Sequence, residues 1–267
     1  MTIRVCMAGV TGWTGSSIAT ALLASPDFQL VGAVARRAAG QTVSEALGVE
    51  GGEDVVISSE VSGALTAPTD VLIDYTHPSS VKGNVLEALA AGVHAVIGTS
   101  GLTADDYDEI DAAARARGRG VIAAGNFSVT AALLKHFAGI AARHVPHWEI
   151  IDMAHASKPD APSGTALELA EYLDGVASNE LTVPIDETLG VRDARGATIG
   201  GAQVHSLRLP SYVISVEAIF GLADERLTIR HDAGSSAEPY VGGTLLAAKA
   251  AIDTVGLIRG LDTLLFG

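Results

Sequence analysis

Three glycines near the amino terminus constrain the fold of this chain more than any other feature. Gly9, Gly12 and Gly15 follow a short β-branched run and precede residues 16–24, whose apolar spacing is that of a helix. A second strand is predicted at residues 30–34, which completes a βαβ unit. Glycines at such a turn let main-chain amides at the start of the helix approach a pyrophosphate. A tight turn without a ligand is the alternative interpretation.

The alternation of strands and helices continues through the first half of the chain. Apolar strand-like runs at residues 71–74, 95–98 and 120–123 alternate with helical segments at 81–91 and 104–117. Strands that are joined by helices in this way align in parallel. We therefore expect an α/β fold with a Rossmann-type doubly wound parallel sheet.

The pattern changes after residue 127. Helices are predicted at residues 130–145 and 165–173. Few helices separate the later strand-like segments, which lie at residues 148–153, 204–209, 212–220 and 226–231. This order predicts a C-terminal α+β domain with a mixed sheet.

The sequence thus predicts two domains. Residues 128–240 form the domain for substrate binding and oligomerisation, and residues 1–127 form the dinucleotide-binding domain. The final helix, at residues 241–255, is apolar enough to return to the first domain, so residues 241–267 complete it.

Composition and charge limit the classes of partner. A formal net charge of −14 argues against nucleic acid and anionic membranes, because an acidic surface repels both. Cys6 is the only cysteine, and the histidines lack metal-ligand spacing, so we predict no disulfide and no metal. We find neither a leader segment nor an apolar run of membrane-spanning length, and we expect a cytoplasmic protein.

Two arginines follow the second predicted strand, where NAD-binding proteins carry an acidic residue for the ribose hydroxyl. Arg36 and Arg37 offer guanidinium groups instead, which match phosphate oxygens. This predicts a preference for NADPH, with NADH as an alternative coenzyme. Two solvated arginines at a strand end are the other interpretation.

Five segments carry a resemblance to a known family. They are residues 9–15, Asp-Tyr-Thr-His-Pro at 74–78, Gly-Thr-Ser-Gly at 98–101, Gly-Asn-Phe-Ser at 125–128 and Lys-Pro-Asp-Ala-Pro-Ser-Gly-Thr at 158–165. Together they resemble the dihydrodipicolinate reductases, and the last of them is specific to that family. The resemblance implies a reductase that delivers hydride to the C=N bond of a cyclic imine, and a homotetramer joined through C-terminal sheets.

The resemblance also assigns residues to the coenzyme. In the family, the Gly-Thr-(Thr/Ser)-Gly and Asn-Phe-Ser stretches line its nicotinamide half. Trp13 replaces an arginine usual in the family, and turn architecture explains His77 as well as a coenzyme contact does. The expected coenzyme contacts are Gly9, Thr11, Gly12, Trp13, Thr14, Gly15, Arg36, Arg37, Thr76, His77, Gly98, Thr99, Ser100, Asn126 and Phe127.

The fifth segment provides the expected substrate site. It opens a predicted helix with free amides, which receive anions. By analogy with the family, Lys158, Ser163, Gly164 and Thr165 grip a substrate carboxylate. The alternative is that Ser163 or Thr165 only caps the helix and Lys158 is solvated.

Three departures from the family pattern fall in the substrate half. Ala154 stands where the family has a proton-donating histidine, residues 233–237 lack the expected substrate-binding arginine, and residues 213–217 lack the Gly-Glu-His-Thr of typical members. Because hydride addition to a neutral imine leaves a high-energy nitrogen anion, either a protonated nitrogen or a nearby acid is required. A preformed iminium needs no donor, only negative charge to stabilise it, and Glu217 suits that case. The candidates are His155, which we favour, Lys158 and Glu217, although His155 is equally well explained as a structural histidine.

These departures lead us to favour a reductase with an altered substrate pocket, acting on a less anionic cyclic imine or imino acid. The second hypothesis is a genuine dihydrodipicolinate reductase of lysine biosynthesis. The third is a non-catalytic NADPH-binding sensor that kept the nucleotide fold.

Overall fold

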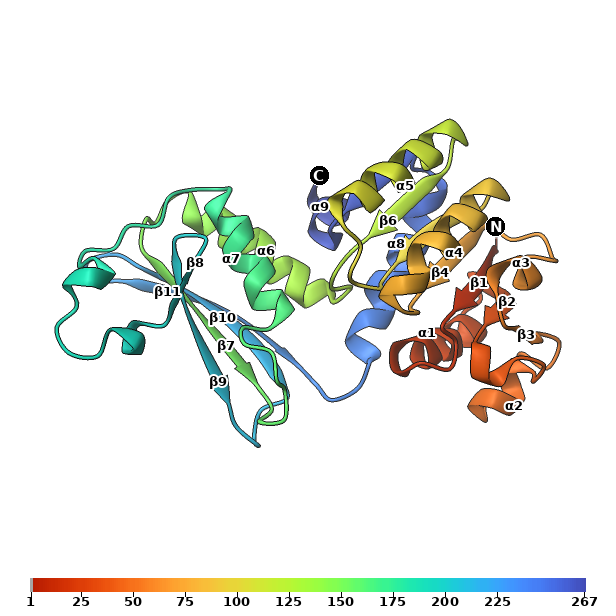
Figure 1. Ribbon diagram of the computed structural model, residues 1–267, viewed down its shortest axis with the longest axis horizontal. Coiled ribbons are helices and arrows are strands. Elements are labelled where there is room, and N and C mark those ends of the chain that lie inside the picture. The colour runs from red at the N-terminus through yellow and green to blue at the C-terminus, as the bar shows by residue number, and fades with distance from the viewer. Residues whose placement is uncertain (1) are drawn as a thin grey trace. The chain divides into compact units, whose positions relative to one another are not determined.

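The computed structural model describes residues 2–267, which cluster into two compact units (Figure 1). The first unit contains the chain up to Val129 and again from Ala237 to Gly267. The second unit spans Thr130 to Ser236. Within residues 2–267, every helix is too short or too polar to cross a membrane.

The first unit is built on a seven-stranded parallel sheet with the strand order β12-β6-β5-β4-β1-β2-β3. Its strands are β1 Ile3–Ala8, β2 Phe28–Val34, β3 Ile57–Ser58, β4 Val71–Asp74, β5 His94–Ile97, β6 Gly120–Ala123 and β12 Gly256–Arg259. The order reverses direction between β1 and β4, which is the switch point where ligands bind in open α/β sheets.

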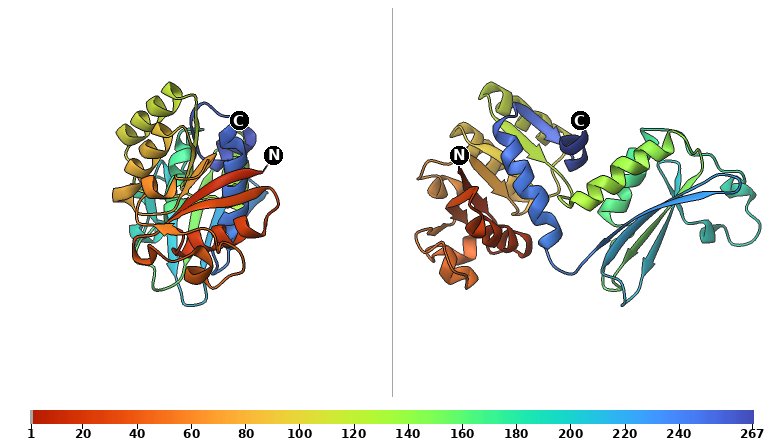
Figure 2. Two further views of the ribbon diagram at one scale, coloured as in Figure 1. Left: turned by 90° about the vertical axis from the view of Figure 1, so that its right-hand side faces the viewer. Right: turned by 180° about the vertical axis from the view of Figure 1, so that it is seen from behind.

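Helices cover both faces of this sheet. Their bounds are α1 Trp13–Ala24, α2 Val43–Leu47, α3 Val61–Ala64, α4 Pro78–Ala90, α5 Ala104–Ala116, α8 Glu238–Ile252 and α9 Leu261–Phe266. Helices α1 and α8, red and blue in Figure 2, pack against each other on one face. Helices α3, α4 and α5 pack on the other, where buried side chains such as Val85, Ile97 and Ile110 form the core.

The second unit has a five-stranded mixed sheet with the order β11-β10-β7-β9-β8. Strands β7 and β9 are parallel, and the other neighbours are antiparallel. The strands are β7 Trp148–Ala154, β8 Ala197–Ile199, β9 Ala202–Arg208, β10 Ile214–Gly221 and β11 Arg226–Ala233. Helices α6 (Val129–Ala142) and α7 (Gly164–Asp174) cover one face.

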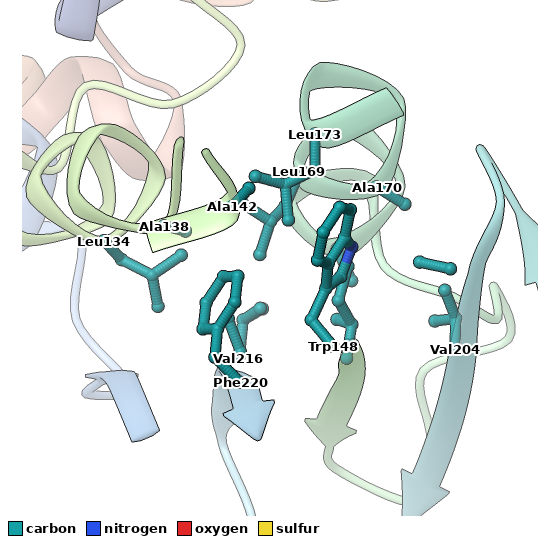
Figure 3. Packing of buried hydrophobic residues seen from close by; sticks show 14 of the residues in the cluster. Leu134, Ala138, Ala142, Trp148, Leu169, Ala170, Leu173, Val204, Val216 and Phe220 are labelled. Atoms are coloured by element: carbon teal, nitrogen blue, oxygen red, sulfur yellow. The ribbon is translucent and has the colours of Figure 1, made fainter. Parts of the chain in front are cut away.

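The core of the second unit lies between these helices and the sheet (Figure 3). The rings of Trp148 and Phe220 pack against each other in a tilted arrangement at a centroid distance of 5.9 Å, and Leu134 of α6 and Leu169 of α7 lie over them. Alternate residues of β10, among them Val216, point into this core. The residues between them therefore lie on the opposite face of the sheet.

The predicted fold class is confirmed: one parallel sheet between helices and one mixed sheet. Several short elements were not predicted, namely α2, α3 and β3 between β2 and β4, β8 in the second unit, and β12 and α9 at the end. Elements of two to six residues show too little of any period to be recognised. The predicted last helix therefore ran to residue 255, whereas α8 ends at Ile252 and a strand follows.

Candidate active site

The glycine turn of the first unit requires glycine, because there is no space for a side chain at two of its positions. Gly9 has φ 85°, and a Cβ on it would lie 2.2 Å from the carbonyl oxygen of Tyr75. A Cβ on Gly15 would lie 2.0 Å from the carbonyl oxygen of Gly9. Both distances are much shorter than a van der Waals contact. Glycine therefore allows the main chain of the turn to pack directly against itself and against the residue that follows β4.

The turn presents the open start of α1. Gly12 caps this helix without a side-chain hydrogen bond, and its first turn, which includes Trp13 and Thr14, has no acidic residue. Helices α2 and α5, by contrast, are closed by the capping boxes of Thr42 and Thr103. The free amides of α1 fit the pyrophosphate of a dinucleotide.

Arg36 and Arg37 lie directly after β2, in a single turn of 3-10 helix at Arg36–Ala38. Both side chains are exposed, and neither has a hydrogen bond or an ion pair within residues 2–267. Two guanidinium groups beside the glycine turn are therefore available to a phosphate. Trp13 is also exposed and makes an edge contact with Tyr240 at 6.0 Å.

Asp74 is a buried carboxylate at the end of β4, and it fixes two threonines. Its Oδ1 accepts hydrogen bonds from the hydroxyls of Thr76 and Thr99, both at 2.7 Å. Its Oδ2 accepts a hydrogen bond from Asn84 of α4, also at 2.7 Å. The carboxyl ends of β4 and β5 are thus held together beside the switch point between β1 and β4.

Tyr75 is a partly buried residue next to Asp74 and Thr76 in the sequence. Its hydroxyl pairs with Thr244 of α8 at 2.8 Å, and burial raises the pKa of the phenol well above its ordinary value. A Cβ on Gly98 would overlap the ring, at 2.1 Å from Cζ. Phe127 packs on the same ring at 6.2 Å and is itself buried, so only its main chain is available to a ligand.

The remaining residues that were expected at the coenzyme lie around this end of the sheet. Ser100 is exposed after β5, Thr11 is exposed in the glycine turn, and Asn126 accepts a hydrogen bond from the amide of Ser128. His77 caps α4 by accepting the amide of Ser79 at 3.2 Å. This contact matches the alternative that we gave for His77 from the sequence, in which it serves the turn before α4.

In the second unit, Asp152 anchors the loop between β7 and α7. It is fully buried, and its Oδ2 accepts hydrogen bonds from the amide of Ser163 at 2.9 Å, the hydroxyl of Ser206 at 3.1 Å and Nη2 of Arg208 at 2.7 Å. Nη2 of Arg208 also donates to the carbonyl of Asp160 at 2.6 Å. The loop is therefore tied to β7 and β9 by a buried ion pair.

Two candidate proton donors lie in this loop. His155 is exposed, and its Nδ1 accepts the amide of Ser157 at 3.2 Å, which leaves Nε2 as the proton-bearing nitrogen of the neutral ring. Lys158 is bound to Asp160 at 2.9 Å, and this hydrogen bond lowers the pKa of the Asp160 carboxyl. Ala154, where the family has a histidine, is fully buried.

The start of α7 carries the other residues that were expected at the substrate. Ser163 is buried and caps the helix, where its hydroxyl accepts the amide of Ala166 at 3.4 Å and keeps its hydrogen as a donor. Gly164 is exposed at the first helical position. Thr165 follows it, partly exposed, and interacts within the protein.

The structure does not bring Glu217 to this loop. Glu217 alternates with Val216 and Ala218, which point into the core beneath α7, so its side chain lies on the opposite face of the sheet. There it faces Arg230 of β11 at 3.4 Å. The structure therefore gives Glu217 an ion pair with Arg230, and its expected part in proton transfer stays a prediction.

Sequence reasoning missed the two buried aspartates and Arg208. A carboxylate inside an otherwise apolar strand is the signal that points to Asp74 and Asp152, because a buried charge needs partners. The partner of Asp152 is Arg208, 56 residues away, which no local pattern connects to it. Within residues 2–267, no three acidic, histidine or cysteine side chains gather as metal ligands.

Both halves of the chain match models of one protein family. The model of "Dihydrodipicolinate reductase, N-terminus" matches residues 3–127, and that of "Dihydrodipicolinate reductase, C-terminus" matches residues 127–265. The 4-hydroxy-tetrahydrodipicolinate reductase of Moorella thermoacetica is 40% identical over 266 residues, which cover 99% of this chain and 98% of the relative. The enzyme of the same name from Thermosynechococcus vestitus is 36% identical over 269 residues, covering 98% and 97%.

Solved structures agree with these matches. A dipicolinate-bound dihydrodipicolinate reductase from Paenisporosarcina sp. TG-14 superposes with a TM-score of 0.89 at 29% identity, covering 99% of this chain and all of that one. An amine dehydrogenase from Mycobacterium smegmatis has a TM-score of 0.67 at 15% identity, over 98% of this chain and 96% of that one, and shares the fold.

The two sheets, the glycine turn and these matches together define an NAD(P)H-dependent oxidoreductase that acts on a C=N bond. The predicted class of enzyme and its nicotinamide cofactor are thus confirmed. The chain belongs to the dihydrodipicolinate reductase family. The relatives that match over the full length are named 4-hydroxy-tetrahydrodipicolinate reductase. This similarity favours our second hypothesis, a genuine dihydrodipicolinate reductase, over the altered substrate pocket that we favoured from the sequence.

Proposed function

We propose that this enzyme is a cytoplasmic, NADPH-dependent 4-hydroxy-tetrahydrodipicolinate reductase of lysine biosynthesis. One observation supports this above all: residues 158–165 keep the whole Lys-x-Asp-Ala-Pro-Ser-Gly-Thr sequence, and the buried Asp152 anchors the loop that carries it. A rigid anion-binding loop suits a cyclic imine that bears carboxylates. Neither a neutral imine nor a cofactor sensor has a use for it.

The first unit would hold the coenzyme. The amides at the start of α1 would bind the pyrophosphate, Arg36 and Arg37 the 2′-phosphate, and Thr76 with Ser100 the nicotinamide end. When bound, the reduced nicotinamide supplies the hydride. Asp74 would act as a positioning residue, because it orients Thr76 through a 2.7 Å hydrogen bond.

The second unit would hold the substrate. The amide of Gly164 and the hydroxyl of Thr165 at the start of α7 suit one carboxylate, with Lys158 supplying the positive charge. Lys158 must then share its ammonium between Asp160 and the substrate. His155, through Nε2, is the proposed donor of the proton that the reduced nitrogen requires.

The test of this function is NADPH oxidation with enzymatically generated 4-hydroxy-tetrahydrodipicolinate beside a panel of monocarboxylic and neutral cyclic imines. We expect turnover on the dicarboxylate, and a kcat about 100-fold lower in His155→Gln, the ordinary effect of losing a general acid. His144→Gln, which removes another exposed histidine, is the matched control. Turnover on the other imines alone would overturn the proposal and restore the altered-pocket hypothesis.

Coenzyme preference has a separate test. Replacing Arg36 and Arg37 with alanine should weaken NADPH binding about 10- to 100-fold and leave NADH binding unchanged, because only NADPH carries the 2′-phosphate. Arg143→Ala, another exposed arginine, serves as the control. An unchanged ratio of the two affinities would contradict the assignment.

Self-association is the remaining proposal. The face of the mixed sheet that α6 and α7 leave uncovered carries Ile151, Leu207 and Ile219, and Leu207 is 39% exposed. We expect homotetramers joined through these faces. Light scattering after size-exclusion chromatography should show a smaller oligomer for Leu207→Glu than for the wild type. Leu246→Glu, which alters an equally exposed leucine of α8, is the control and should leave the oligomer unchanged. A monomeric wild-type protein would refute the tetramer.

A further inference from the structure

A pocket in the first unit lies at the amino ends of the parallel strands. It has a volume of about 520 Å³, in the range of small-molecule sites. Its charged and titratable lining residues are Arg4, Asp70, His94, Arg119, Lys249 and Asp253. The glycine turn lies at the other end of β1, about 20 Å away for a strand of this length.

His94 fixes the hydrogen bonding inside this pocket. It is buried, and its Nδ1 accepts the amide of Gly120 at 2.9 Å, so the neutral ring carries its proton on Nε2. The main chain of Ala251 in α8 pairs with the ring, and burial together with the charge of Arg119 lowers the pKa of the imidazole. His94 is therefore neutral, and its Nε2 is a donor.

Arg119 is left without an acceptor by this arrangement. Its Nη1 lies 3.4 Å from Nε2 of His94, but two nitrogens that both carry protons cannot form a hydrogen bond. Its Nε is buried and has no partner within residues 2–267. Arginines in comparable surroundings, such as Arg195 and Arg208, each face a carboxylate.

The other charges in the pocket do not satisfy Arg119. Asp70 is held by the main-chain amide and the guanidinium of Arg4, at 2.6–2.9 Å. Lys249 is paired with Asp27 at 2.5 Å. Asp253 is exposed and has no side-chain hydrogen bond within residues 2–267, so it disfavours ligands of high negative charge.

We infer that this pocket binds a small anion, a monocarboxylate or a phosphate, through the guanidinium of Arg119. The Nε and Nη2 hydrogens of a guanidinium point to the same side, as the pairing of Arg4 with Asp70 shows, and in Arg119 neither nitrogen has a hydrogen bond within residues 2–267, so this planar fork matches two oxygens of either group. The protein carries a net charge of −14, so a basic group held apart from its many carboxylates is needed to attract such a ligand. The site is independent of the proposed function.

The test is calorimetric titration of the full chain with acetate and, separately, with inorganic phosphate, in chloride buffer of constant ionic strength. Saturating NADP⁺ and dipicolinate keep the glycine turn, Arg36 and the proposed carboxylate site at residues 158–165 occupied, so that neither anion reports on those sites. We expect saturable binding of at least one anion with one site per chain. Affinity should fall about 10- to 100-fold in Arg119→Gln, the range for losing a charge-assisted contact.

Arg117→Gln is the matched control, because it removes the same charge from an exposed arginine two residues away that donates to the carbonyl of Ala90. Its affinity should equal that of the wild type. The Nε–H resonance of Arg119, assigned by its loss in Arg119→Lys, should shift with the same saturation curve. Binding that is unsaturable, or that is equally strong in Arg119→Gln, would overturn the inference.

Discussion

Replacing Asp152 with alanine should destabilise the second unit by about 3–5 kcal/mol, the range for removing one partner of a buried ion pair. The side chain of Asp152 is fully buried, and that of Arg208 is 17% exposed, so water cannot replace the lost carboxylate. Arg208 would keep only the carbonyls of Leu207 and Asp160, and the buried amide of Ser163 would lose its acceptor.

The two tryptophans make this loss measurable for one unit alone. Trp148 is buried in the core of the second unit, whereas Trp13 is 60% exposed in the first. In a Trp13→Phe background, urea unfolding followed by tryptophan fluorescence therefore reports the second unit. The lost anchor should also raise the KM for the imine while the Kd for NADPH stays constant.

Glu149→Ala is the matched control. Glu149 also lies on β7 and also pairs with an arginine, Arg195, but its side chain is 38% exposed. Solvent screens such a pair, so its loss should cost at most about 1 kcal/mol. Equal losses in the Asp152 and Glu149 variants would refute the argument that burial makes the Asp152 pair strong.

Three further results are expected. Gly15→Ala should disrupt the first unit and abolish coenzyme binding, because the new Cβ would lie 2.0 Å from the carbonyl oxygen of Gly9. Gly83→Ala, where a Cβ on α4 meets open space, should instead stabilise the protein by about 0.5–1 kcal/mol in thermal unfolding. Because burial lowers the pKa of His94 and His231 from 6.5, the unfolded chain binds protons first on acidification, so the free energy of unfolding should fall as the pH drops below about 6.5. A His94→Gln/His231→Gln variant with an unchanged pH profile would contradict this. Lys158→Met should raise the KM for the dicarboxylate about 10-fold or more with little change in NADPH binding, and an unchanged KM would remove Lys158 from the site.

The parallel sheet could be predicted because its strands are buried on both faces and appear in the sequence as apolar runs between helical periods. Strand β12 could not, since four residues after a long helix show no period of their own. Its place depends on pairing with β6, a contact between distant parts of the chain.

The residues of the candidate site also differ in whether local sequence could predict them. The glycine turn is local in sequence, and its residues could be named in advance. The ion pair of Asp152 and Arg208 joins two strands, so only the fold reveals it. For Glu217 a usable signal was present: the alternation of Val216, Ala218 and Phe220 places Glu217 away from the helices.

The first unit is discontinuous along the chain, and this sets an order for its synthesis. The ribosome releases β6 long before β12, with the whole second unit made in between. At about 5–20 residues per second, β6 waits roughly ten seconds for its neighbour. During that time the nascent sheet has an unpaired edge that can pair with other chains, and α1 lacks the helix that packs beside it. Residues 237–267, which carry both α8 and β12, therefore decide when the coenzyme-binding half can complete its fold.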